Sequence, residues 1–129
     1  MPSNLPAVTG DVLTADIFNS LVCFTCPADK TADYTAVLGD SYQTLISMNK
    51  ATAVAFKIPT NASAAIPVGS VITVLNKGAG AVTISAVTSG TTTILSAGAV
   101  AAAPTLAQYK TAACIKTATD TWYVVGAIG

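Results

Sequence analysis

The sequence predicts a mainly β protein: an antiparallel β-sandwich or barrel-like domain of about seven to eight short strands, preceded by an N-terminal arm with one short helix. Two observations carry this prediction. From Tyr34 onward the chain consists of β-branched and small residues interrupted by Gly, Pro and Asn, whereas residues 9–22, "TGDVLTADIFNSLV", have a helical pattern. The length of 129 residues suits one domain with its own core. We therefore divide the chain into an N-terminal arm, residues 1–30, and a β domain, residues 31–129.

The helix is predicted over about residues 15–23, because its start is well marked. Thr14 is a good N-cap, and Asp16 lies in the first turn, where the helix dipole favours an anion. Leu13 and Phe18 have the spacing of a hydrophobic staple. So short a helix is marginal alone and must dock on another surface. The predicted contact residues are Leu13, Ile17, Phe18, Leu21 and Val22.

Turn signals divide the rest of the chain into strands. "VITVLNKGAGAVTISAV", residues 71–87, is the clearest predicted hairpin, and we expect its glycines to supply positive φ values. A second hairpin is predicted over residues 110–127. The Ala-rich segment 96–108 is predicted to be a loop, because Pro104 argues against a helix. The predicted strands are 34–38, 42–49, 53–58, 70–76, 81–87, 91–95, 110–117 and 121–127.

The strands "VITVL" and "WYVV" are apolar on both faces, although a small sandwich covers only one face of each sheet. The chain is 52% hydrophobic and only 9% charged, with six Lys, six Asp and no Arg, Glu or His. Such a surface favours cover by another copy of the chain. It lacks the basic face that nucleic-acid binding requires, and no apolar run is long enough to span a membrane.

Catalytic chemistry is sparse, so we predict neither an enzyme, nor a cofactor, nor a metal site. Without His, the Ser/His/Asp and Cys/His arrangements are excluded. The Asp residues lie at turns or caps, where short acidic residues serve the backbone. "CFTC", with Cys23 and Cys26, has the spacing of a redox or zinc motif. The better interpretation is that these two cysteines and Cys114 are small, mostly buried thiols. Calcium binding by Asp and Asn oxygens is the alternative to the absence of a metal site. Trp122 is expected to pack in the core rather than to stack on a sugar.

A resemblance covers nearly the whole chain. The run "TLISMNKATAVAFKIPTNASAAIPVGSVITVLNKGAGAVTISA" and the closing "ACIKTATDTWYVVGAIG" resemble a small β module of tailed-bacteriophage virion proteins: head decoration, head-fibre and distal tail-fibre proteins. The opening "GDVLTADIFNSLV" is similar to a segment that often precedes such modules. The shared features are turn and core residues, among them Asn49, Pro67 to Gly69, Gly78 to Gly80, and Trp122 with Gly126.

The resemblance implies a homotrimeric capsid decoration, or cement, protein on the outer surface of a virion, bound to the major capsid protein or another virion protein through its N-terminal region. A tail, collar or head-fibre component is one alternative, and a glycan or host-surface binding module is another. The amino end has no basic n-region or continuous apolar segment, so we expect synthesis in the host cytoplasm. No nucleic acid or membrane partner is expected.

Overall fold

The computed structural model describes residues 24–41 and 44–129, and within these ranges the fold is mainly β. The helical content of this part is one 3-10 turn, η1 (Leu38–Ser41). All eight predicted segments contain a strand, and a short strand in the segment predicted to be a loop, β7, was missed. The strands are β1 (Tyr34–Thr35), β2 (Thr44–Met48), β3 (Val54–Ile58), β4 (Val71–Asn76), β5 (Val82–Ala86), β6 (Thr93–Ser96), β7 (Thr105–Leu106), β8 (Thr111–Ala118) and β9 (Thr121–Gly126).

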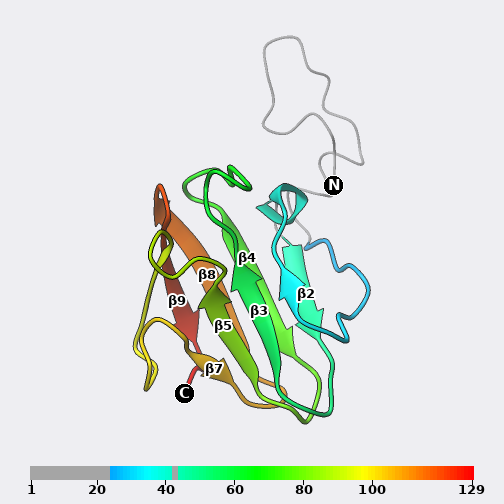
Figure 1. Ribbon diagram of the computed structural model, residues 1–129. Coiled ribbons are helices and arrows are strands. Elements are labelled where there is room, and N and C mark those ends of the chain that lie inside the picture. The colour runs from blue at the N-terminus through cyan, green and yellow to red at the C-terminus, as the bar shows by residue number, and fades with distance from the viewer. Residues whose placement is uncertain (1–23, 42–43) are drawn as a thin grey trace, which may run out of the picture.

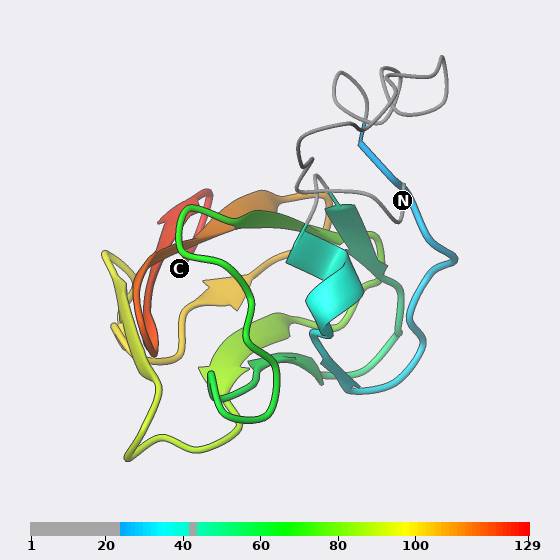
Figure 2. The ribbon, with the colours of Figure 1, turned by 90° about the horizontal axis from the view of Figure 1, so that it is seen from above.

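The strands form two sheets that share one core (Figure 1). The four-stranded sheet has the order β1-β3-β5-β7, and the five-stranded sheet has the order β2-β4-β8-β9-β6. Alternate side chains point inward, so Phe56 and Ile84 of one sheet join Val74 and Trp122 of the other in a single buried cluster. Trp122 is 1% exposed, which confirms its predicted core position. Figure 2 shows the sheets on opposite sides of this core.

From β1 to β5 the chain alternates between the two sheets, so consecutive strands do not pair with each other. Instead, β3 lies parallel to β1, β4 parallel to β2, and β5 parallel to β3. The partners Thr44↔Ile72 and Val54↔Val82 are each about 28 residues apart, so the chain winds in successive coils. Parallel bridges from Thr25 and Lys30 to β2 extend this winding into residues that the sequence placed in the arm.

After β5 the winding gives way to mostly antiparallel pairing. β7 lies antiparallel to β5, β8 to β4, and β9 to β8, while β6 pairs parallel with β9 at the far edge of the larger sheet. The predicted hairpin of residues 110–127 is confirmed as β8 and β9, with a register shift between Lys116 and Ala118. Both sheets are therefore mixed.

The antiparallel expectation was wrong for four of the seven strand pairings. The hairpin predicted over residues 71–87 does not form, because β4 and β5 belong to different sheets. The loop between them pairs with the loop of the preceding coil: the Lys77 amide donates to the Met48 carbonyl at 2.8 Å, and the Gly80 amide to the Lys50 carbonyl at 3.0 Å. Its backbone groups are thus satisfied by a neighbouring coil and not by a hairpin.

The glycines of this loop serve close packing. The positive-φ glycines of the described chain are Gly69 and Gly126, so the conformational role expected for Gly78 and Gly80 was wrong. A Cβ on Gly78 would overlap the backbone of Lys50, and one on Gly80 would overlap the carbonyl of Thr52. The missing side chains allow one loop to lie directly on the other.

The helix predicted at about residues 15–23, and with it most of the arm, lies outside the described residues. Within the described ranges, no helix has the length and apolar character needed to cross a bilayer.

Candidate interaction surface

The outward side of the five-stranded sheet carries a row of apolar side chains across four adjacent strands. Leu95 of β6 pairs with Tyr123 of β9, Tyr123 pairs with Ile115 of β8, and Ile115 pairs with Val71 of β4. Cross-strand partners on one face lie side by side, so the four form a continuous strip. Val125, two residues after Tyr123, adds to it. We call Val71, Leu95, Ile115, Tyr123 and Val125 the apolar face.

The apolar face belongs to a sheet whose outward side bears no charge. Val125 leads a second row through Ala113 and Thr73 to Leu45 on β2. Among all residues of the five strands, Lys116 is the only charged one, and it points inward and is 2% exposed. A sheet face that normally meets water would carry polar and charged side chains at these alternate positions.

Within this single chain the apolar face is open. Tyr123 is 44% exposed and Val125 is 50% exposed, while their neighbours Trp122 and Val124 are each 1% exposed. The strand "WYVV" is therefore apolar on both sides with only one side covered. Contiguous exposed apolar surface of this kind commonly marks a contact with another molecule.

The four-stranded sheet provides a contrast. Its outward positions include Lys57 on β3, with Thr83 and Ser85 on β5 and Thr105 on β7. These polar and charged side chains suit a face that meets solvent. The two sheets are thus unequal on the outside although they share one core.

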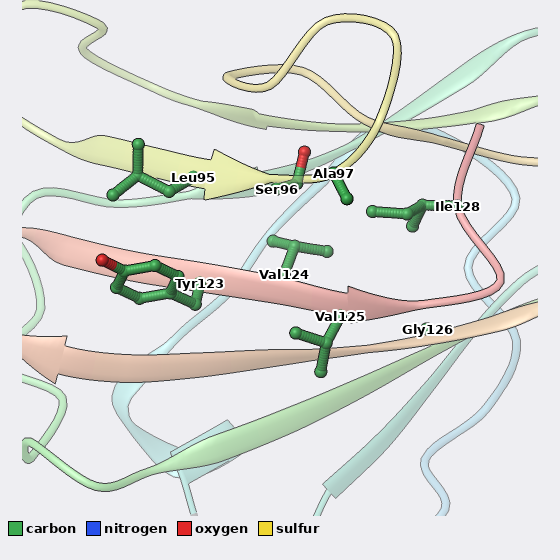
Figure 3. A pocket seen from close by; sticks show the side chains of 8 residues that line it. All are labelled: Leu95, Ser96, Ala97, Tyr123, Val124, Val125, Gly126 and Ile128. Carbon is green, nitrogen blue, oxygen red and sulfur yellow. The ribbon is translucent and has the colours of Figure 1, made fainter.

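A groove of about 420 Å³ lies beside the apolar face, where β6 ends and the chain terminates. Figure 3 shows Leu95 on one strand next to Tyr123 and Val125 on the other, with Ile128 from the C-terminal residues. Gly126 ends β9 with φ +137°, and a Cβ there would lie 2.6 Å from the Thr111 carbonyl oxygen. The backbone at Gly126 therefore packs closely against β8, and this packing defines one wall of the groove. No charged residue lines it.

The described residues offer little catalytic chemistry. Burial raises the pKa of the Cys114 thiol to about 12, which keeps it protonated and unreactive at neutral pH. Cys26 is exposed, so the expectation of a buried thiol was wrong at this position, and Cys23 lies outside the described residues. Among the residues described, no group of three His, Cys, Asp or Glu side chains could hold a metal ion.

The described Asp residues take part in the hydrogen bonding of the fold. Asp33 accepts from the Ala55 amide at 2.9 Å, and Asp40 accepts from the Tyr34 hydroxyl at 2.6 Å and the Val37 amide at 3.0 Å. Asp29 accepts from Asn49 at 3.2 Å and forms an ion pair with Lys77 at 2.9 Å. Lys77 and Asn49 hold the pKa of Asp29 below its usual value. These contacts join loops and strands to one another.

The contact residues predicted in the arm, Leu13, Ile17, Phe18, Leu21 and Val22, lie outside the described residues. The sequence did indicate the other surface through the doubly apolar strands "VITVL" and "WYVV". It missed Leu95 and Ile115, because each strand alone looks ordinary and only the register brings them beside Tyr123.

Comparisons with family models, curated proteins and solved structures returned no match. The function is therefore argued from the geometry and the sequence resemblance.

Proposed function

We propose that this chain is a non-enzymatic structural protein of a tailed-bacteriophage virion: a homotrimeric decoration, or cement, protein on the outer surface of the capsid. The observation that supports the proposal best is the uncharged outward side of the five-stranded sheet, with Tyr123 and Val125 exposed on β9, next to the edge strand β6. In this proposal the two sheets form a β-sandwich that stands outward as a knob.

The apolar face is the surface between sister chains. Because it carries no charge, copies can approach it without like-charge repulsion, and a net charge of zero adds none. Burying apolar area contributes roughly 25 cal/mol per Å², and a standard interface buries about 800 Å² on each partner. Three such contacts around a three-fold axis would cover the strands that are apolar on both sides.

The capsid contact is assigned to the arm, through Leu13, Ile17, Phe18, Leu21 and Val22. Decoration is then a mechanical function: apolar contacts repeated across capsomer joints add cohesion to the shell. Trimer formation raises the strength of attachment, because each arm that binds holds the other two near their sites.

The two contacts can be tested separately with full-length variants. Val125→Lys places a charge in the apolar face, so we expect it to sediment as a monomer where the natural chain sediments as a trimer. Thr83→Lys adds the same charge to the outward side of the other sheet and should remain trimeric. A natural chain that stays monomeric at high concentration would contradict the proposed assembly.

Phe18→Asp tests the capsid contact. We expect this variant to remain trimeric but to leave undecorated heads bare, whereas the natural chain occupies them in hundreds of copies. Normal decoration by Phe18→Asp would refute the role given to the arm. A handful of copies per particle would instead favour a tail, collar or head-fibre position, and saturable binding to one sugar on a glycan array would favour the host-surface alternative.

A further inference from the structure

Lys116 is a buried lysine at the end of the core. It lies on β8 at an inward position and is 2% exposed. Its Nζ donates to Oδ1 of Asn61 at 2.6 Å and to the carbonyl of Ile66 at 2.6 Å, and it lies 6.0 Å from the centroid of the Trp122 ring. The amine is therefore held against the side-chain amide of Asn61, near the ring of Trp122.

No carboxylate of residues 24–41 or 44–129 forms an ion pair with this lysine. The ion pair of the described chain joins Lys77 and Asp29, far from this site in the fold. A buried ammonium without a paired anion is unfavourable, so burial lowers the pKa of Lys116, although Asp120 acts in the opposite direction. A greater share of the amine is thus neutral, with a free lone pair, than for a lysine in water.

Asp120 holds Asn61 from the other side. It lies in the turn between β8 and β9 with φ +57°. Its Oδ1 accepts from the Asn61 backbone amide at 2.7 Å and from the Thr92 hydroxyl at 3.5 Å. The Asn61 backbone is therefore held by the Asp120 carboxylate, and the Asn61 side chain is held by the Lys116 amine. Both of these groups come from the hairpin of β8 and β9.

We propose that Lys116 and Asn61 form an intramolecular isopeptide bond, with Asp120 as the group that carries the proton. The lone pair of the Lys116 Nζ attacks Cγ of Asn61 and forms a new C–N bond. The Cγ–Nδ2 bond then breaks, and Nδ2 leaves as ammonia after taking one proton that the attacking Nζ gives up. The products are a secondary amide and one ammonia, so the step needs neither oxidant nor reductant.

The placement of the three groups suits this reaction. The Lys116 Nζ already lies 2.6 Å from Oδ1 of Asn61, so the two groups do not have to meet by diffusion before they react. The Asp120 carboxylate is bonded to the Asn61 backbone amide and its charge acts on Lys116, so we assign to it the transfer of the proton from Nζ to Nδ2. Asn61 is only half-buried, so ammonia has a route to solvent.

The bond would tie the loop after β3 to β8, two parts of the chain 55 residues apart. A cross-link of this span restricts the unfolded chain in the same way as a disulfide, and reducing agents do not break it.

The test is mass spectrometry of the purified full-length chain, followed by trypsin. We expect the intact mass to be lower than that of the sequence by about 17 Da, one ammonia. Trypsin should fail to cut after Lys116, and the peptide that contains Asn61 should be joined to the peptide that contains Lys116. An unchanged mass overturns the proposal. A succinimide at Asn61 would remove the same mass but leave the two peptides separate, and that result also overturns it.

Variants locate the reacting groups. Asn61→Ala and Lys116→Met should each abolish the cross-linked peptide, whereas Lys57→Met, at an outward position of the other sheet, should retain it in full. Asp120→Asn keeps an oxygen for the Asn61 amide but cannot carry the proton, so the cross-linked fraction should fall at least about tenfold at early times. Unchanged cross-linking in Asp120→Asn would overturn the role of Asp120.

Discussion

Gly78 and Gly80 show how single atoms decide the path of this chain. Because a Cβ on either glycine would overlap the backbone of residues 50–52, the loop can stack on the preceding coil only without side chains. We expect Gly80→Ala to lower the free energy of unfolding by about 1–3 kcal/mol, the usual effect of overpacking. Urea unfolding followed by tryptophan fluorescence measures this.

Gly39 provides the matched control for that substitution. It has no atom within 4 Å of an added Cβ and no positive φ, so Gly39→Ala should change stability by less than about 1 kcal/mol. Equal losses in the Gly39 and Gly80 variants would contradict the packing explanation.

Cys114 makes stability depend on pH in the alkaline range. Burial raises the pKa of this thiol to about 12, whereas in the unfolded chain it ionises near pH 8.5. Between these values the unfolded state loses the proton first, so stability is full below about pH 8.5 and falls as the pH rises toward 12.

We expect Cys114→Ala to remove up to about 1.4 kcal/mol per pH unit of this decline above pH 9. Urea midpoints at pH 8, 9.5 and 10.5 would show it, with Cys26→Ala as the exposed-thiol control. If the natural and Cys114→Ala chains decline in parallel, the thiol is not the titrating group.

At the scale of elements, Asn76 joins the end of β4 to two other segments. It is fully buried, and its Nδ2 donates to the Gly80 and Leu106 carbonyls at 2.9 Å each while its Oδ1 accepts from the Gly78 amide at 3.0 Å. Asn76→Ala removes these three hydrogen bonds from a buried site, so we expect a loss of about 2–4 kcal/mol in unfolding free energy.

Met48 is the register partner of Asn76 one coil earlier, and the next residue, Asn49, provides the comparison. Its side chain is exposed and bonds Asp29 at 3.2 Å, so Asn49→Ala should cost less than about 1 kcal/mol in chemical denaturation. A loss as large as that of Asn76→Ala would show that the coil end is stabilised by a repeated ladder and not by the buried network.

The sequence identified the strands well but not how they pair. β-branched runs and turn residues place the strands along the chain, and these are local properties. Whether "NKGAGA" closes a hairpin or passes to the other sheet depends on what the loop packs against, which is not local. The repetition of "NKATAV" as "NKGAGAV" was the available signal, since equivalent corners in successive coils stack.

The same limit applies to the candidate surface. Doubly apolar strands indicated that an outward face needs cover. Leu95 comes beside Tyr123 only through a parallel pairing at the edge of the sheet, and Ile115 through the register of β8 and β9. The burial of Lys116 was missed for a similar reason, because a lysine in a strand is normally expected to point outward. Its partner Asn61 is 55 residues away, beyond any local pattern.

At the scale of the whole molecule, charge and apolar surface are separated. The charged residues of the described ranges lie in loops, on η1, on the four-stranded sheet or inside, and the outward side of the five-stranded sheet has none. An assembly formed through that side depends on the hydrophobic effect and not on ion pairs, and its response to salt and temperature should show this.

We therefore expect the dissociation constant of the proposed trimer to change less than about threefold between 50 and 500 mM NaCl, since the apolar face has no charged pair to be screened. Association should weaken on cooling toward 4 °C and show a negative heat-capacity change, because apolar hydration becomes less unfavourable in the cold. Sedimentation equilibrium across salt and temperature, with dilution calorimetry, measures both responses. A steep loss of affinity with salt would mean that Lys and Asp residues form the contact, and the apolar face would then have to be given up as the surface between subunits.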